Sequence, residues 1–199
     1  MMDSASRYTK TAVVLHWLIA FCIFGMFALG WYMADLPKEA PKQMAYDIFN
    51  WGIYTWQLAA EATPRTFYFN LHKSLGVTIM ALITLRIVWR ITHRPPPLLK
   101  TYKEWEQKLA HGTHHLLYLL MIALPVSGII MATYSKYGIK WFGKPLVQGL
   151  DNNPMREIFK EAHEVIGIVI LVVIGLHILG AIKHKMIDKD DTLKRMSMH

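Results

Sequence analysis

The sequence predicts an all-α membrane protein, a bundle of four transmembrane helices. The 199-residue chain is 53% hydrophobic and has a mean hydropathy of +0.23, which is high for a soluble domain of this size. It also contains four apolar stretches, each long enough to cross the roughly 30 Å hydrocarbon core of a bilayer. No repeat or low-complexity tract interrupts them, so we expect one transmembrane domain over residues 1–199.

The first span carries features that argue against removal as a signal peptide. It is too long for the apolar region of such a peptide, and the bulky Tyr32 before Ala34 makes a poor cleavage site.

Polar and helix-breaking residues in later spans are tolerable. Arg86 lies near the end of its span and can extend to the membrane surface, and neighbouring helices can accommodate Pro125. The expected spans are residues 12–34, 71–91, 115–134 and 162–182.

The charge distribution predicts the topology. With the N-terminus placed in the cytoplasm, the inner segments carry more lysine and arginine than the two outer loops, which favours cytoplasmic locations for both termini. The net charge of +8 needs no nucleic-acid partner, because anionic lipid headgroups on the inner leaflet account for it. The single cysteine, Cys22, excludes an internal disulfide.

Two connections differ in character. Residues 92–113 contain the stiff run Pro95-Pro96-Pro97, followed by a polar and helical lead into the third span. Residues 35–70 form a long outer loop that is rich in tyrosine, tryptophan and phenylalanine. Such rings suit the headgroup level of a membrane, so we expect a short interfacial helix over Lys42 to Ala60 that anchors the loop without chemistry of its own.

Two histidines mark the last span as functional. His163 and His177 are fourteen residues apart in an otherwise aliphatic segment. At ~100° per residue they share one helix face, and at ~1.5 Å per residue they lie about 21 Å apart, near the two edges of the bilayer core. An ionisable side chain inside a membrane is costly and indicates a functional site with a partner.

Each of these histidines has a partner at its own depth. His16 and His177 lie near the inner side of their helices, whereas His72 and His163 lie near the outer side. Two imidazoles at each of two depths predict two haems, each with two histidine ligands. Zinc fits less well, because two histidines give an incomplete ligand set. Gly76 and Gly167 each follow an outer histidine by four residues, which leaves room on the imidazole's own face for a porphyrin.

The chain resembles the prokaryotic cytochrome b561 family over nearly its whole length. The motifs that carry the resemblance are Leu15-His16-Trp17, His72-Lys73-Ser74-Leu75-Gly76, Leu109-Ala110-His111, Tyr118-Leu119-Leu120, Ala123-Leu124-Pro125, Gly175-Leu176-His177 and Lys189-Asp190-Asp191-Thr192-Leu193. The resemblance implies a four-helix protein of the bacterial inner membrane with two haems b. It also implies the same ligand pairs, His16 with His177 and His72 with His163.

The resemblance leaves two functions open. One branch of the family, the superoxide oxidase, takes electrons from periplasmic superoxide and reduces ubiquinone. Other branches are non-catalytic cytochrome b subunits that link a periplasmic dehydrogenase or hydrogenase to the quinone pool. The superoxide reaction is favoured by the absence of a fused domain and by the second outer loop, where basic residues outnumber acidic ones and can attract an anion. The loop 35–70 is longer than expected for the superoxide oxidase and can dock a partner.

Further polar residues are candidates for electron and proton transfer. Arg86 lies on the face of His72 at the depth of the inner haem, where it pairs with a haem propionate or extends to lipid headgroups. His184 lies nearly two turns beyond His177, where an inner-surface ubiquinone needs a hydrogen-bond donor and proton source. By position it matches a histidine of the superoxide oxidase, and we assign it the catalytic role. His111 and His114 flank the same surface.

Overall fold

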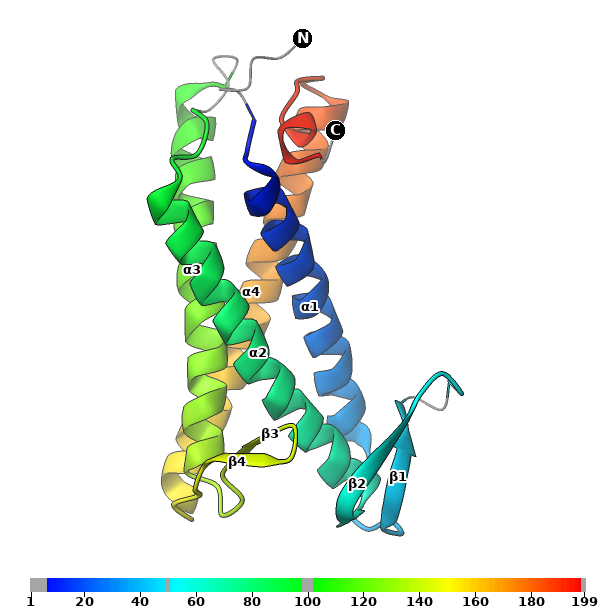
Figure 1. Cartoon of the computed structure of the whole chain (residues 1–199). Coiled ribbons are helices and arrows are strands. Elements are labelled where there is room, and N and C mark those ends of the chain that lie inside the picture. Colours follow the sequence, from blue (N-terminus) through cyan, green and yellow to red (C-terminus); the bar gives the residue numbers. More distant parts are fainter. Residues whose placement is uncertain (1–6, 49–50, 98–101, 198–199) are drawn as a thin grey trace.

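The computed structural model, which describes residues 7–48, 51–97 and 102–197, contains four long helices (Figure 1). Each is long and apolar enough to cross a membrane, which confirms the predicted all-α membrane architecture. The third helix begins well before its apolar stretch, so the polar lead into it is helical. The helices are α1 (Lys10–Asp35), α2 (Pro64–Thr92), α3 (Glu104–Thr133) and α4 (Asn153–Met186).

At several helix ends, side chains form hydrogen bonds with backbone N–H or C=O groups that have no partner within the helix. Thr9, Thr63 and Asn152 precede α1, α2 and α4, and each accepts a hydrogen bond from an N–H in the first turn of its helix. The last turn of α1 has carbonyls without helical partners, and the Arg65 guanidinium of α2 donates to them. Its acceptors are the carbonyl oxygens of Met33, Ala34 and Leu36.

The two ends of the bundle are structurally distinct. The N- and C-termini lie at one end, which we call the termini end, and two β-hairpins lie at the other, the hairpin end (Figure 1). Helix α1 packs mainly against α2, and α4 packs mainly against α3. Both histidine pairs therefore lie between these two helix pairs, where α4 faces α1 and α2.

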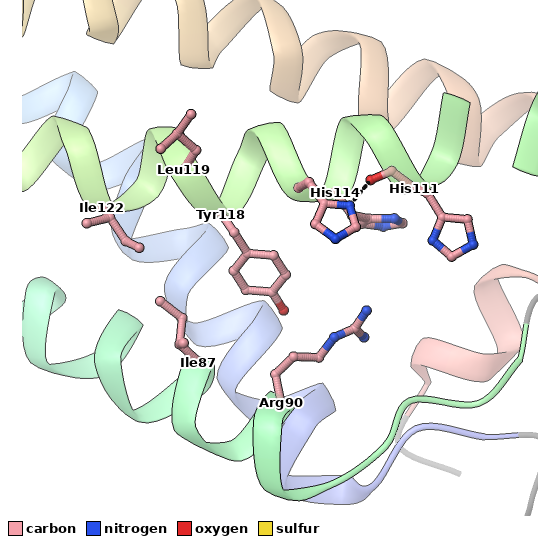
Figure 2. A pocket seen from close by; sticks show the side chains of 8 residues that line it. Ile87, Arg90, His111, His114, Tyr118, Leu119 and Ile122 are labelled. Carbon is pink, nitrogen blue, oxygen red and sulfur yellow. Dashed lines mark hydrogen bonds between the residues drawn. The ribbon is translucent and has the colours of Figure 1, made fainter. Parts of the chain in front are cut away.

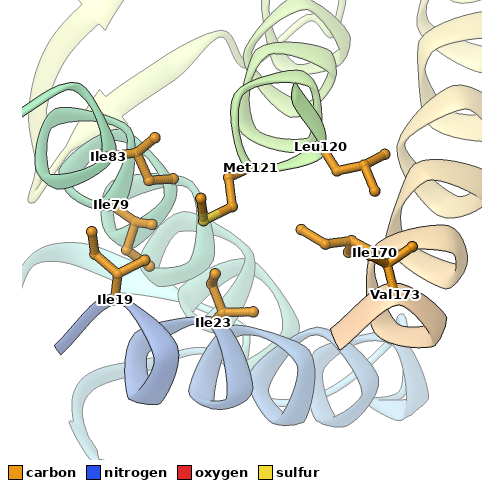
Figure 3. Close-up of a cluster of buried hydrophobic side chains, with 8 residues drawn as sticks. All are labelled: Ile19, Ile23, Ile79, Ile83, Leu120, Met121, Ile170 and Val173. Carbon is orange, nitrogen blue, oxygen red and sulfur yellow. The ribbon is translucent and has the colours of Figure 1, made fainter. Parts of the chain in front are cut away.

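A cluster of aliphatic side chains from all four helices fills the middle of the bundle (Figure 3). In α4 this cluster contains Ile170, which is fully buried and lies between His163 and His177 in the sequence. The cluster therefore separates the two histidine levels with a water-excluding apolar layer. Its buried members are Ile19, Ile23, Ile79, Ile83, Leu120, Met121, Ile170 and Val173.

The first hairpin replaces the interfacial helix that we expected over Lys42 to Ala60, and that expectation is wrong. Strand β1 (Gln43–Asp47) pairs antiparallel with β2 (Thr55–Ala62). Trp56 and Leu58 alternate with more exposed residues and pack against the bundle, which is the two-residue period of a strand. Tyr46 stacks on Phe67 of α2 with ring centroids 4.5 Å apart. The aromatic rings thus pack against α2.

The second hairpin covers α2 beside His72. Strands β3 (Ile139–Trp141) and β4 (Lys144–Val147) are joined by a two-residue turn in which both residues have positive φ. The Ser74 hydroxyl donates to the Lys140 carbonyl at 3.1 Å and accepts from the Phe142 N–H at 3.0 Å. These bonds hold the hairpin against the helix that carries His72.

The segment that follows α4, residues 187–197, folds back against the helices at the termini end. It contains a short 3-10 helix, η3 (Leu193–Met196). The Trp17 indole of α1 donates to the Met196 carbonyl at 3.0 Å. The Arg195 guanidinium donates to the Pro97 carbonyl at 2.7 Å. The segment therefore ties α1 to the connection between α2 and α3.

Candidate functional site

Four histidines form two facing pairs at different levels of the bundle. The rings of His16 (α1) and His177 (α4) have centroids 6.4 Å apart and planes 76° apart. The rings of His72 (α2) and His163 (α4) have centroids 6.5 Å apart and planes 79° apart. The structure thus brings together the same residues that the depth argument paired.

The spacing within each pair fits one metal ion between two imidazoles. A metal–imidazole bond is about 2 Å long, and the ligating nitrogen lies ~1.1 Å from the ring centre, from standard bond lengths. Two imidazoles on opposite sides of one metal therefore have centroids about 6.3 Å apart, close to the observed 6.4 and 6.5 Å. The four histidines are thus suited to hold two haem irons.

His163 has the orientation expected of a ligand. Its Nδ1 lies 3.0 Å from the Leu124 carbonyl of α3 and 3.0 Å from the Ser127 hydroxyl. Because a carbonyl only accepts, Nδ1 carries the proton, and Nε2 is left free to bind iron. A Cβ at Gly128 would lie only 3.0 Å from the imidazole, so this glycine is needed for the ring's position.

His72 lacks such support. Its Nδ1 is buried, and no hydrogen-bond partner lies near it among the residues that the structure describes. A buried nitrogen of this kind is costly unless another group satisfies the ring. Gly30 of α1 lies beside the ring, and a Cβ there would be 3.7 Å from it. Sequence reasoning missed Gly30 and Gly128, because both face their histidine from another helix.

The two glycines chosen from the sequence have a milder role. A Cβ at Gly76 would lie 3.8 Å from the Met26 side chain, and one at Gly167 would lie 3.6 Å from Phe27. These are ordinary contact distances, and both neighbours belong to α1. Both positions therefore have room for a Cβ, and their proposed role beside a porphyrin stays a prediction.

Arg86 lies at the His16 level, as its spacing predicts. Its guanidinium donates to Nδ1 of His16 at 3.0 Å and lies 5.6 Å from the centre of the Tyr118 ring. An imidazole that accepts at Nδ1 carries its proton on Nε2 when neutral. Ligation through Nε2 therefore requires Arg86 to leave this nitrogen, which would free the guanidinium for an anion such as a propionate.

His184 belongs to a hydrogen-bonded cluster at the termini end. Its Nδ1 lies 2.8 Å from Asp190 and 3.0 Å from Asp188, and its ring stacks on Tyr102 with centroids 4.3 Å apart. Burial alone would raise the pKa of Asp190, but hydrogen bonds from Thr192 and His184 outweigh burial and hold that pKa below its ordinary value. The cluster therefore keeps an ionised carboxylate beside an imidazole.

The second predicted surface, on α3, borders a cavity of about 270 Å³ between α2 and α3 (Figure 2). His111 and His114 both line it, and the His114 ring lies 5.3 Å from that of His177. Arg90 and Tyr118 also line it. The sequence analysis gave neither residue a role in a site, since one arginine and one tyrosine near a membrane surface resemble ordinary anchors.

Lysines of the connection between α3 and α4, the second predicted outer loop, lie at the hairpin end. Lys140 and Lys144 are exposed on β3 and β4, and Lys136 lies over the Tyr137 ring. In contrast, Arg156 and Lys160 form ion pairs with the neighbouring carboxylates of Glu157 and Glu164. The positive charge that can attract an anion is therefore concentrated on the hairpin, near the His72 level.

Comparison with known proteins extends over the whole chain. A family model described as prokaryotic cytochrome b561 matches residues 7–198. Cytochrome b561 homolog 2 of Escherichia coli (strain K12) is 32% identical over 197 residues, which cover 98% of this chain and 93% of that protein. Probable superoxide oxidase CybB of Yersinia pestis is 27% identical, with 96% and 95% covered. Cytochrome b561 homolog 1 of E. coli (strain K12) is 26% identical, with 96% and 97% covered.

Proposed function

Since the chain belongs to the prokaryotic cytochrome b561 family, we propose that it moves electrons from superoxide at the hairpin end to ubiquinone at the termini end. Family membership makes it a bacterial membrane electron-transfer protein and implies b-type haem. The number of haems, the donor, the acceptor and the orientation belong to the proposal. In it the termini end faces the cytoplasm, and the protein lies in the inner membrane.

The observation that carries this proposal is the pair of facing imidazoles at each of two levels. His72 and His163 would hold one haem, and His16 and His177 would hold the other. Each haem would supply a one-electron redox centre, and the two histidines of its pair would both bind the iron. The two levels are about 21 Å apart along α4. The buried side chains of the layer between them are all apolar and offer no group that could carry a proton.

The proposed reaction balances in electrons and protons. Two superoxide anions lose one electron each and leave as two molecules of O₂. One ubiquinone takes up those two electrons together with two protons and becomes ubiquinol. The electrons enter at the hairpin end and leave at the termini end, where the protons are taken up. The chain therefore needs an anion-attracting surface at one end and proton-holding groups at the other.

The hairpin lysines supply the first of these requirements. Lys136, Lys140 and Lys144 are exposed, and none of them forms an ion pair with a carboxylate among the described residues. A surface of one charge raises the local concentration of an oppositely charged substrate, and its association rate rises by about 10- to 1,000-fold. Superoxide is a small anion, so this surface favours it over a neutral donor.

The His184 cluster supplies the second requirement. Nδ1 of the His184 imidazole lies 2.8 Å from the Asp190 carboxylate, which is positioned to accept a hydrogen bond from it. His184 is less exposed than Asp188, but its cluster borders a small cavity of about 190 Å³. In the proposal His184 holds a proton at the termini end and passes it toward the reduced quinone.

An assay of the purified protein alone tests this function. Haem-loaded protein would receive superoxide from an enzymatic generator in the presence of decylubiquinone. The proposal predicts one quinol for every two superoxide anions consumed, in the absence of any second protein. Catalase would be added to remove peroxide, and protein without haem would serve as the control. A protein that consumes no superoxide and forms no quinol would contradict the proposal.

The first hairpin favours a second candidate, an electron-transfer subunit that docks a periplasmic dehydrogenase or hydrogenase. Its exposed apolar side chains include Met44, Ile53 and Tyr54, and Ile53 is 80% exposed. Exposed apolar groups gathered on one element are typical of a protein-binding surface. In this case quinol would form only after the partner protein and its substrate are added, so the same assay separates the two functions.

A further inference from the structure

The cavity between α2 and α3 at the termini end is separate from the space between the paired imidazoles. Its volume of about 270 Å³ is near the lower end of the roughly 300–1,000 Å³ that is usual for small-molecule sites. Neither His16 nor His177 lines it. It therefore has room for one substituted ring beside the inner histidine pair.

Two hydrogen-bond donors in this cavity have no partner among the residues that the structure describes. Arg90 extends from α2 and Tyr118 from α3 into the space between the helices (Figure 2). In the part of the chain that the structure describes, neither the Arg90 guanidinium nor the Tyr118 hydroxyl makes a hydrogen bond or ion pair. The Arg86 guanidinium lies over the Tyr118 ring, 5.6 Å from its centre. Both donors are therefore available to a ligand that carries acceptor oxygens.

The walls of the cavity change from polar to apolar along α3. Nearer the termini end they are formed by Arg90, His111 and His114, and farther into the bundle by Leu119 and Ile122. Leu119 is 63% exposed within a helix that is apolar enough to cross a membrane, so it faces lipid. The cavity thus suits a ligand with a polar head and an apolar tail that arrives from within the bilayer.

His114 connects the cavity to the inner histidine pair. It lines the cavity, and its ring lies 5.3 Å from that of His177 in an edge-to-face arrangement. A ligand in the cavity would therefore be one side chain away from a proposed haem ligand, which is close enough for direct electron exchange.

The cavity beside His184 is less suited to a quinone ring. It is smaller, at about 190 Å³, and its walls include the carboxylates of Glu106, Asp188 and Asp190. Quinone oxygens are hydrogen-bond acceptors, and carboxylates offer them no donor. Among the described residues that line it, the aromatic rings are those of Tyr102 and His184, which already stack on each other, and the remaining side chain is Lys103.

We propose that the cavity between α2 and α3 binds the headgroup of ubiquinone, with Arg90 and Tyr118 donating hydrogen bonds to its carbonyl oxygens and the isoprenoid tail leaving past Leu119. This inference rests on the proposed function, because it names the binding site of the proposed acceptor. It places the quinone in a cavity that His184 does not line, so that ring binding and proton supply are carried by separate groups.

Conservative substitutions test the two donors. Loss of one hydrogen bond to a neutral donor typically weakens binding by about fivefold, and loss of a charged donor by about tenfold or more. Tyr118→Phe and Arg90→Gln should therefore raise the KM for decylubiquinone by these factors. Haem content and the rate of haem reduction by dithionite should not change. Tyr134→Phe, at the other end of α3, and Arg94→Gln, beyond the end of α2, are the matched controls.

A photoreactive azido-ubiquinone locates the ring independently of turnover. After irradiation of the haem-loaded protein, the label should lie on peptides containing residues 87–90 or 111–122, and excess ubiquinone should prevent labelling. Labelling of residues 184–196 instead, or a KM unchanged in both variants, would overturn this site while quinol formation by the unmutated protein still supported the proposed function. If the unmutated protein binds the probe here but forms no quinol, the proposed function fails and the site stands.

Discussion

The two histidine pairs have similar spacing but different surroundings. At the hairpin end, the backbone of α3 fixes His163, and a hairpin bonded to α2 covers the level of His72. At the termini end, an arginine contacts His16, a third histidine lies against His177, and the nearby surface is rich in groups that exchange protons. The difference suggests a rigid site where only electrons enter and a polar site where electrons and protons meet.

Removal of one ligand from each pair should have the largest effect. His163→Ala should lose the haem at the hairpin end and His177→Ala the haem at the termini end, because each change removes one axial bond. The haem-to-protein ratio, measured from the pyridine haemochrome spectrum, should fall from two to one in each variant. His115→Ala, which removes an exposed histidine from α3, should keep both haems. Loss of both haems from His163→Ala would show that the two sites are not independent.

A side chain at Gly128 should have the next largest effect, and only at the hairpin end. A Cβ there would lie 3.0 Å from Cε1 and 3.2 Å from Nδ1 of His163, whose ring is already held by Leu124. Gly128→Val should therefore lower haem occupancy at this site, whereas Gly167→Ala should have little effect, because its nearest neighbour would be at 3.6 Å. Equal haem content in the two variants would contradict the rigid-site interpretation.

The Ser127 hydroxyl should have a smaller effect on the same site. Groups that orient a metal-bound histidine commonly change metal affinity by about 10- to 100-fold, and Ser127→Ala should be near the lower figure because Leu124 still accepts from Nδ1. Competition for haem with apomyoglobin measures this affinity. Thr133→Ala, which removes another hydroxyl of α3 bonded within its own helix, is the control.

Charge at the hairpin end should affect the rate of electron entry without affecting the haems. Replacement of Lys136, Lys140 and Lys144 by Gln should slow haem reduction by superoxide by about tenfold at low salt. Salt screens charges over about 8 Å at 0.15 M, so the unmutated protein should slow in the same way as ionic strength rises. Stopped-flow absorbance follows the reduction. A rate that does not depend on salt would rule out steering by these lysines.

His184 should affect only the exit of electrons. If it supplies a proton to the quinone, His184→Ala should lower quinol formation while haem reduction by superoxide continues at its normal rate. Stopped-flow absorbance and a quinone absorbance assay separate these half-reactions. Normal turnover of this variant would remove His184 from the mechanism and leave the histidine pairs unaffected.

The smallest expected effect concerns the docking of the C-terminal segment, residues 190–196. We expect this segment to detach only when the pH falls to the range in which Asp190 becomes protonated. The pKa of Asp190 is lower in the folded chain than its ordinary value of 3.8. The ionised carboxylate therefore stabilises the docked segment above pH 3.8, and this stabilisation is lost as the pH falls through the lowered pKa. Hydrogen-exchange protection of residues 190–196 should stay constant between pH 7 and pH 5. Asp190→Asn should lower protection at pH 7, and a segment unaffected by this change would contradict the role of the carboxylate.

The sequence was sufficient to predict the elements that depend on local pattern. Four long apolar stretches predicted four helices, and helical spacing was enough to place His163 and His177 on one face. What it could not predict depends on contacts between elements. The loop 35–70 forms a hairpin because Tyr46 and Trp56 pack against the bundle, and the short alternation of Thr55-Trp56-Gln57-Leu58 was too weak a strand signal to reveal that packing.

The same limit applies to the candidate sites. Gly76 and Gly167 were chosen because they lie on the same helix as a histidine, whereas Gly128 matters more and lies on a different helix. The hydrogen bond from His163 to Leu124 joins residues 39 positions apart in the chain. Arg90 and Tyr118 gain significance only from the cavity that they share.

The amount of haem in the unmutated protein tests the central claim most directly. Two facing imidazole pairs predict two haems b per chain, and both should be low-spin because each iron has two histidine ligands. Purified protein would be assayed for haem and for protein mass, and its oxidised form would be examined by electron paramagnetic resonance. A ratio of two with only low-spin signals is the predicted result. A ratio of one, or a stoichiometric high-spin signal, would contradict the assignment of both pairs.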